Sequence, residues 1–176
     1  MKRGIAGIFA GHYIKAHREA VKFAKEVYLT VIPSKPNLDI CFFNLYPEDT
    51  ELSQSPKGFN IFFNTKKLIN RKGALIFLTA ATEGRGFHSL LAETGSKLYS
   101  NNKALWNLTV NTLLKRNKFG IFSPNVNRTD ILHFYPPSTI FHTDFNNMIK
   151  ELEEIYGRSP KVGIFPCSIQ MPVQNL

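Results

Sequence analysis

The stretch LDICFFNL, residues 38–45, is an almost continuously apolar run that leads directly into the polar loop YPEDT, residues 46–50. A short run without alternation predicts a strand that is buried on both faces, as in a parallel sheet. Residues 74–79 (ALIFLT) repeat the pattern, and segments with helical spacing lie before and after each run. Strands that alternate with helices predict an α/β domain with three layers, in which helices cover both faces of a mostly parallel sheet.

The remaining elements follow from periodicity and from helix-capping residues. We expect helices over residues 13–28, 53–68, 87–98, 102–116 and 145–156, and further strands over residues 119–122, 131–135 and 162–166. Ser53 or Ser55 is expected to cap the second helix and Thr143 the last one, which Gly157 would end. No internal repeat and no change in composition divides the chain, so we expect a single domain.

Length and composition are those of a folded, soluble protein. The chain has 176 residues, 43% of them hydrophobic and 15 of them Phe, which excludes a disordered protein. Cys41 and Cys167 each lie in an apolar run, and we expect two buried thiols in a reducing cytosol. The longest apolar stretch, residues 74–81, is far shorter than the roughly 20 residues of a membrane span. Without a secretory signal, the expected location is cytoplasmic and no membrane partner is expected.

The formal charge of +9 raises the prospect of an anionic partner. The basic pairs at residues 66–67, 71–72 and 115–116 stand near the ends of expected helices, where cations complement the helix dipole. No basic run interleaved with aromatic residues occurs. Nucleic-acid binding is therefore a minor alternative that charge alone supports, and we do not expect a nucleic-acid partner.

The first candidate site lies at the exit of the strand 38–45, because ligands of α/β sheets bind beyond the carboxyl ends of strands. Gln54 and Lys57 are three residues apart at the start of the expected helix, which places both on one face. Unpaired N–H groups of the first helical turn would point the same way. An amide, an ammonium group and backbone donors suit a carboxylate or a phosphate; the alternative is that both residues are ordinary exposed helix residues.

The second candidate site is the loop after the strand 74–79, which reads GRGFHS over residues 84–89. It approaches the dinucleotide pattern G-x-G-x-x-G, with Ser89 in the third glycine position. A stand-alone module for a nucleotide or another anionic metabolite is the alternative function; otherwise Gly84 and Gly86 simply permit a tight turn. His88 could transfer a proton or cap the next helix. No H-E-x-x-H or C-x-x-C pattern occurs, so we expect no metal site made by this chain alone.

The stretch YPEDTELSQSPK, residues 46–57, fits the pattern Y-P-x-D-x-x-L-x-Q-x-x-K. Together with less specific motifs along the chain, it resembles the C-terminal domain of the nickel-pincer-dependent lactate racemase family. The resemblance extends from about residue 7 to 172, with residues 1–12 as a lead-in segment or linker remnant. It also includes the runs at residues 10–12, 16–19, 73–79, 83–84 and 162–166, together with Trp106.

The resemblance implies one half of a two-domain racemase or epimerase that acts on 2-hydroxy acids. The missing N-terminal domain or subunit would carry the nickel-pincer nucleotide and the catalytic histidines, so this chain alone would have no catalytic residue and bind no cofactor. The C-terminal domain would close the cleft, with Gln54 and Lys57 holding the carboxylate of the small substrate and Trp106 on the cleft side. Ser53, where the family often has an aromatic residue, and Pro56 inside the motif depart from the pattern and leave the particular hydroxy acid open.

Overall fold

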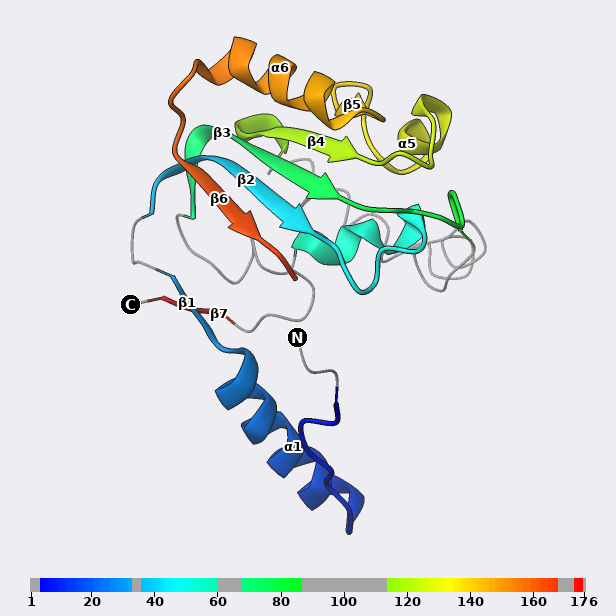
Figure 1. The fold of residues 1–176 in the computed structure, drawn as a ribbon, viewed down its shortest axis with the longest axis vertical. Helices are drawn as coiled ribbons and strands as arrows, with labels where there is room; N and C mark the ends of the chain where they lie inside the picture. Colours follow the sequence, from blue (N-terminus) through cyan, green and yellow to red (C-terminus); the bar gives the residue numbers. More distant parts are fainter. Residues whose placement is uncertain (1–3, 33–35, 60–67, 87–113, 168–172, 176) are drawn as a thin grey trace.

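The computed structural model describes residues 4–32, 36–59, 68–86, 114–167 and 173–175. Over these residues the chain forms a five-stranded parallel sheet in the order β5-β4-β3-β2-β6 and a separate two-stranded parallel sheet of β1 and β7 (Figure 1). The five strands are β2 (Leu38–Asn44), β3 (Ile69–Leu78), β4 (Lys118–Phe122), β5 (Ile140–His142) and β6 (Val162–Phe165). The expected α/β class with a parallel sheet is confirmed.

Alternate residues of the central strands enter two hydrophobic cores. On one face, Cys41 and Phe43 of β2 pack with Phe77 of β3 in a cluster rich in aromatic side chains. On the other face, Phe42 joins a smaller cluster completed by α6 (Phe145–Tyr156), whose Met148 is fully buried. Because both faces of β2 and β3 are covered, the uninterrupted apolar runs of the sequence are accounted for.

The expected strand at residues 131–135 is wrong. Residues Arg128–Phe134 form the helix α5, which begins with a capping box between Asn127 and Asp130. Ile131 and Tyr135, four residues apart, are buried on the sheet side, which is helical and not strand periodicity. The outer strand is instead β5, which the sequence analysis did not identify.

The expected helix at residues 53–68 is only partly observed. Residues Leu52–Gly58 form the 3-10 helix η1, residues 60–67 lie outside the described part, and β3 already begins at Ile69. The strand expected from residue 74 therefore starts earlier. The side chain of Asn117 donates to the carbonyls of Asn70 (2.8 Å) and Gly73 (3.1 Å), which satisfies the backbone of this early segment.

The N-cap of α6 is Asp144, not Thr143 as expected. The Asp144 carboxylate accepts from the backbone N–H of Asn147 at 3.0 Å, and Gly157, with a φ of 74°, ends the helix. The helix expected at residues 87–98 lies outside the described part, as does most of the one expected at residues 102–116, of which residues 114–116 are helical.

The N-terminal helix stands apart from the five-stranded sheet. Helix α1 (Tyr13–Tyr28) contains no buried residue and projects away from the sheet (Figure 1). It leads into β1 (Thr30–Ile32), which pairs with β7 (Val173–Asn175). None of the helices in the described segments is both long and apolar enough to cross a membrane.

The two cysteines differ in environment. Cys41 is buried in β2, as expected, and burial raises the pKa of its thiol to about 12. Cys167 is only half-buried, and its thiol donates to the carbonyl of Tyr46 at 3.3 Å. The expectation of two buried thiols is therefore met at one position only.

Candidate functional site

The two loops that the sequence singled out lie against each other at the carboxyl end of the sheet. The backbone carbonyl of Asp49 accepts from the N–H of Ala81 (2.6 Å), and that of Thr50 accepts from the N–H of Glu83 (2.8 Å). The loop after β2 is thereby fixed to the loop after β3. The two candidate sites form one region of the surface.

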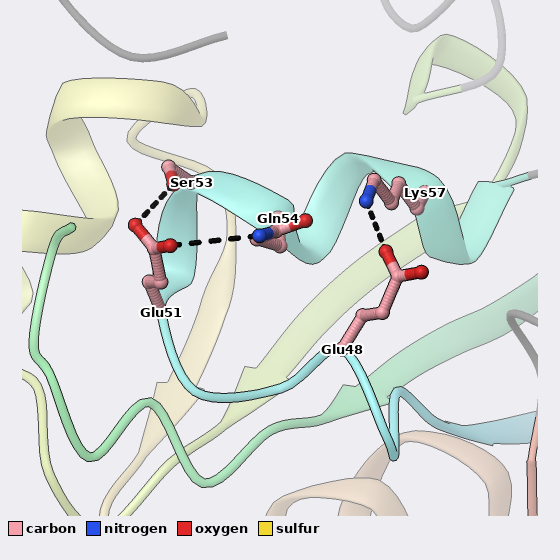
Figure 2. A network of polar contacts seen from close by, with 5 residues as sticks. All are labelled: Glu48, Glu51, Ser53, Gln54 and Lys57. Atoms are coloured by element: carbon pink, nitrogen blue, oxygen red, sulfur yellow. Dashed lines mark hydrogen bonds and ion pairs between the residues drawn. The ribbon is translucent and has the colours of Figure 1, made fainter. Parts of the chain in front are cut away.

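Lys57 is paired with an acid from its own loop. Its ammonium group donates to a carboxylate oxygen of Glu48, which lies in the loop between β2 and η1 (Figure 2). The two side chains are 39% and 36% exposed. A pair with this much exposure contributes only about 0–1 kcal/mol, so Lys57 can exchange Glu48 for another anion at little cost.

Gln54 points toward a second acid, Glu51 (Figure 2). Its amide nitrogen lies 3.5 Å from Oε1 of Glu51, and the hydroxyl of Ser53 donates to Oε2 at 3.0 Å. Glu51 is only 4% exposed and lies against Gly86, where a Cβ would come within 1.9 Å of Oε2. Glu51 therefore belongs to the packed interior of the loop and orients the Gln54 amide.

Gln54 and Lys57 lie on the same side of η1, because residues three apart eclipse each other in a 3-10 helix. Both are partly exposed, whereas Ser53, Ser55 and Pro56 between and before them are buried. Figure 2 shows their polar ends reaching toward the 48–51 segment. The expectation that the two side chains share a face agrees with this geometry; their binding of a substrate is a separate proposal.

The expected free N–H groups of the first helical turn are not found. The N–H of Leu52 donates to the carbonyl of Gly84 (3.0 Å), and that of Ser53 donates to the carbonyl of Arg85 (3.1 Å). The N–H of Gln54 donates to the carbonyl of Glu51 at 3.2 Å. These backbone donors are used within the fold, so recognition of an anion here depends on the side chains.

Buried hydrogen bonds of Ser55 fix the backbone of η1. The hydroxyl of Ser55 lies 2.6 Å from the carbonyl of Leu52 and 2.5 Å from the hydroxyl of Tyr135. Burial raises the pKa of Tyr135, so this phenol stays neutral and acts as a hydrogen-bonding anchor. With Leu52 and Phe59 in the core, the positions of the exposed Gln54 and Lys57 are fixed by packing beneath them.

The glycine loop has a structural use that competes with nucleotide binding. Gly84 (φ 66°) and Gly86 (φ 75°) adopt the left-handed conformation that favours glycine. Their loop delivers carbonyls to η1 and packs on the Glu51 carboxylate, which is an unfavourable neighbour for a phosphate. These contacts favour the tight-turn interpretation. His88 and Ser89 lie outside the described residues.

Glu48 and Glu51 are the site residues that the sequence analysis missed. Both lie in the twelve-residue motif that drew attention to Gln54 and Lys57, so a signal was present at the strand exit: Glu51 precedes Gln54 by three residues, and Glu48 precedes Lys57 by nine. Trp106 lies outside the described part of the chain. Among the residues that the structure describes, no group of three or more His, Cys, Asp or Glu side chains could hold a metal ion.

Comparison with known proteins gives a likeness of fold. No protein-family model matches the sequence, and no curated protein matches it. Among solved structures, the chain is similar to the lactate racemase apoprotein from Thermoanaerobacterium thermosaccharolyticum, with a TM-score of 0.66 and 19% sequence identity. The match covers 93% of this chain but only 41% of that one, so this chain spans less than half the length of the racemase.

Proposed function

We propose that this chain is the substrate-capping domain of a racemase or epimerase that acts on 2-hydroxy acids. The observation that carries the proposal is the likeness to lactate racemase along nearly the whole chain, with a partly exposed Gln54–Lys57 pair at the exit of a central strand. Neither half of this observation is sufficient alone. Together they favour a surface that meets the carboxylate of a small acid.

Lys57 would bind the substrate acid by exchanging its Glu48 partner for the substrate carboxylate, with help from Gln54. The ammonium group of Lys57 leaves Glu48 and donates to the substrate carboxylate, while the Gln54 amide, already oriented by Glu51, donates a second hydrogen bond. A charge-assisted hydrogen bond of this kind contributes about 1.5–3 kcal/mol, against the 0–1 kcal/mol or so of the exposed pair that it replaces. Binding is therefore favourable but weak until a second surface closes over the acid.

The second surface would belong to a domain or subunit that corresponds to the unmatched part of the racemase. We assign the nickel-pincer nucleotide to that partner, and this chain takes part only in binding and enclosing the acid. Trp106 is proposed to face the same cleft. We further propose a cytoplasmic location, in keeping with the two unpaired cysteines.

The test is a titration of the isotope-labelled chain with lactate, followed by NMR. The amide side chain of Gln54 and the signals of Lys57 should shift, and propionate, which lacks the hydroxyl, should bind at the same place more weakly. Lys57→Ala should weaken lactate binding at least about tenfold, through the loss of a charge-assisted hydrogen bond. Lys118→Ala, which removes an exposed lysine at the opposite end of the sheet, is the matched control.

Two results would contradict the proposal. One is a shift pattern that avoids η1 altogether, or lactate binding that is unchanged by Lys57→Ala. The other is racemisation of a 2-hydroxy acid by this chain alone when it is supplied with stoichiometric cofactor, because the proposal gives the chemistry to a partner.

A further inference from the structure

One face of α1 is apolar and uncovered. Ile14, Val21 and Tyr28, spaced by seven residues and therefore on one side of the helix, are 40%, 38% and 50% exposed. Within the described residues, the chain covers a neighbouring part of the helix, where the rings of Phe9 and Phe23 lie 5.5 Å apart. An amphipathic helix gains its stability mainly by burying its apolar face, so α1 lacks the surface that it is built to contact.

A second uncovered apolar surface lies between α6 and the edge strand β6. We call the residues Phe145, Ile149, Val162 and Ile164 the α6–β6 strip; they are 41%, 39%, 44% and 69% exposed. Ile164 pairs in register with Phe42, whose ring lies 6.0 Å from that of Phe145, so helix and edge strand contribute to one surface. Neighbouring exposed apolar side chains of this kind mark an interaction site.

The α6–β6 strip leaves room on the sheet for one more helix beside α6. A parallel sheet is normally covered by helices on both faces, and α6 lies over the central strands of this face, where Met148 and Leu152 are buried. In the described part of the chain, no helix covers Val162 and Ile164 of the edge strand beside it. The missing element is a helix with one apolar side, which is what α1 is.

The charges of the two helices are complementary. Helix α1 carries four Lys or Arg residues and two Glu residues, a formal charge of +2. Helix α6 carries three Glu residues and one Lys, a formal charge of −2. The opposite net charges of the two helices favour this pairing.

The chain itself holds α1 away from its own strip. Strand β1, directly after α1, pairs in register with β7 over Thr30 to Ile32, and α1 projects outward from that pair (Figure 1). We propose that α1 of one copy packs on the α6–β6 strip of a second copy, and the reverse, in a closed two-fold dimer. A chain that carries both halves of one helix–sheet contact, held apart, is the starting condition for such an exchange.

The dimer is independent of the proposed binding function. The strip lies on the face of the sheet that carries α6, whereas Leu52 of η1 packs in the cluster on the opposite face. Gln54 and Lys57 therefore stay accessible in the dimer. A failure of lactate binding leaves the dimer untouched, and a monomeric protein leaves the binding proposal untouched.

The first experiment measures the mass of the full chain in solution by light scattering at about 50 µM. The expected mass is twice that of the 20.0 kDa chain. Val21→Glu on α1 and Ile164→Glu on the strip should each return the mass to that of one chain, with an unchanged far-UV spectrum because both positions are exposed. Leu132→Glu, an exposed apolar position on α5, is the matched control and should remain dimeric.

A mixture of the two variants distinguishes exchange from other forms of association. The Ile164→Glu chain has an intact α1 and the Val21→Glu chain an intact strip, so the mixture should regain a heterodimer with one of the two contacts. A wild-type mass of one chain overturns the proposal. So does a mixture that stays monomeric, or a dimer that the Ile164→Glu variant leaves intact, which would indicate pairing of α1 with α1.

Discussion

At the scale of single residues, the candidate site is governed by two carboxylates. Lys57 is paired with Glu48, and the amide of Gln54 points to the buried Glu51. The sequence identified the two donors because an amide and an ammonium group three residues apart at a strand exit form a recognisable pattern. It did not identify their acceptors, because which acid a loop brings to which donor depends on how the loop folds back.

The buried Glu51 also explains the neighbouring glycine, and a substitution there tests the packing. Gly86→Ala should destabilise the protein by about 2–4 kcal/mol, because it adds a Cβ in the left-handed region that would overlap the Glu51 carboxylate. At this chain length that lowers the melting temperature by roughly 4–16 °C. Gly84→Ala is the control: its φ is also positive, but nothing lies within 4 Å of the added Cβ. Equal losses at both positions would contradict the close contact with Glu51.

At the scale of elements, substitutions at the neighbouring residues Thr143 and Asp144 test which of them caps α6. Asp144→Ala should cost about 1 kcal/mol in the free energy of unfolding, because it leaves the N–H of Asn147 without its acceptor. Thr143→Ala should cost a few tenths of a kcal/mol at most. Denaturant titration of the two variants compares them directly. A larger loss at Thr143 would restore the assignment made from sequence.

The elements that the sequence predicted correctly have strong local signals. Strand β2, β4, β6 and the helices α1 and α6 follow from uninterrupted apolar runs or from clear helical spacing. The segment 131–135 was assigned wrongly because ILHFY is rich in strand-favouring residues, while its helical state is set by the capping box at Asn127 and by burial of Ile131. Strand β5 is too short to show a pattern, and β1 and β7 depend on pairing across the whole chain.

A carboxylate that joins three strands gives a pH-dependent prediction. Asp39 of β2 accepts from the amide of Asn70 in β3 (2.6 Å) and from the N–H of Lys161 just before β6 (2.8 Å). The hydrogen bond from Lys161, followed by that from Asn70, lowers the pKa of Asp39 below its ordinary value of 3.8. The stabilisation is therefore present above about pH 3.8 and is lost as the pH falls through the lower pKa of the folded state.

The measurement is the stability of Asp39→Ala relative to wild type between pH 7 and pH 2. The difference should be largest at neutral pH and should shrink below about pH 4, once Asp39 is protonated in wild type as well. Glu154→Ala, at an exposed position on α6, serves as a control for general charge effects. A difference that stays constant over this range would show that the Asp39 carboxylate does not link the strands.

At the scale of the whole molecule, the fold and the function rest on different kinds of observation. The α/β fold follows from the apolar runs and agrees with the likeness to lactate racemase. The proposed function depends on a small part of the surface, at the point where the loops after β2 and β3 meet. Sequence motifs indicated that place. Only the structure shows that the N–H groups of Leu52 and Ser53 are already hydrogen-bonded to the carbonyls of Gly84 and Arg85.

The measurement that tests the central claim most directly is the dissociation constant for lactate in Glu48→Gln and Lys57→Ala, set beside wild type. Removing the Glu48 charge frees Lys57 from its competitor, so Glu48→Gln should bind lactate several-fold more tightly, whereas Lys57→Ala should bind it at least about tenfold more weakly. Opposite changes are the result that the account predicts. Two variants with the affinity of wild type, or a Glu48→Gln variant that loses binding, would contradict it.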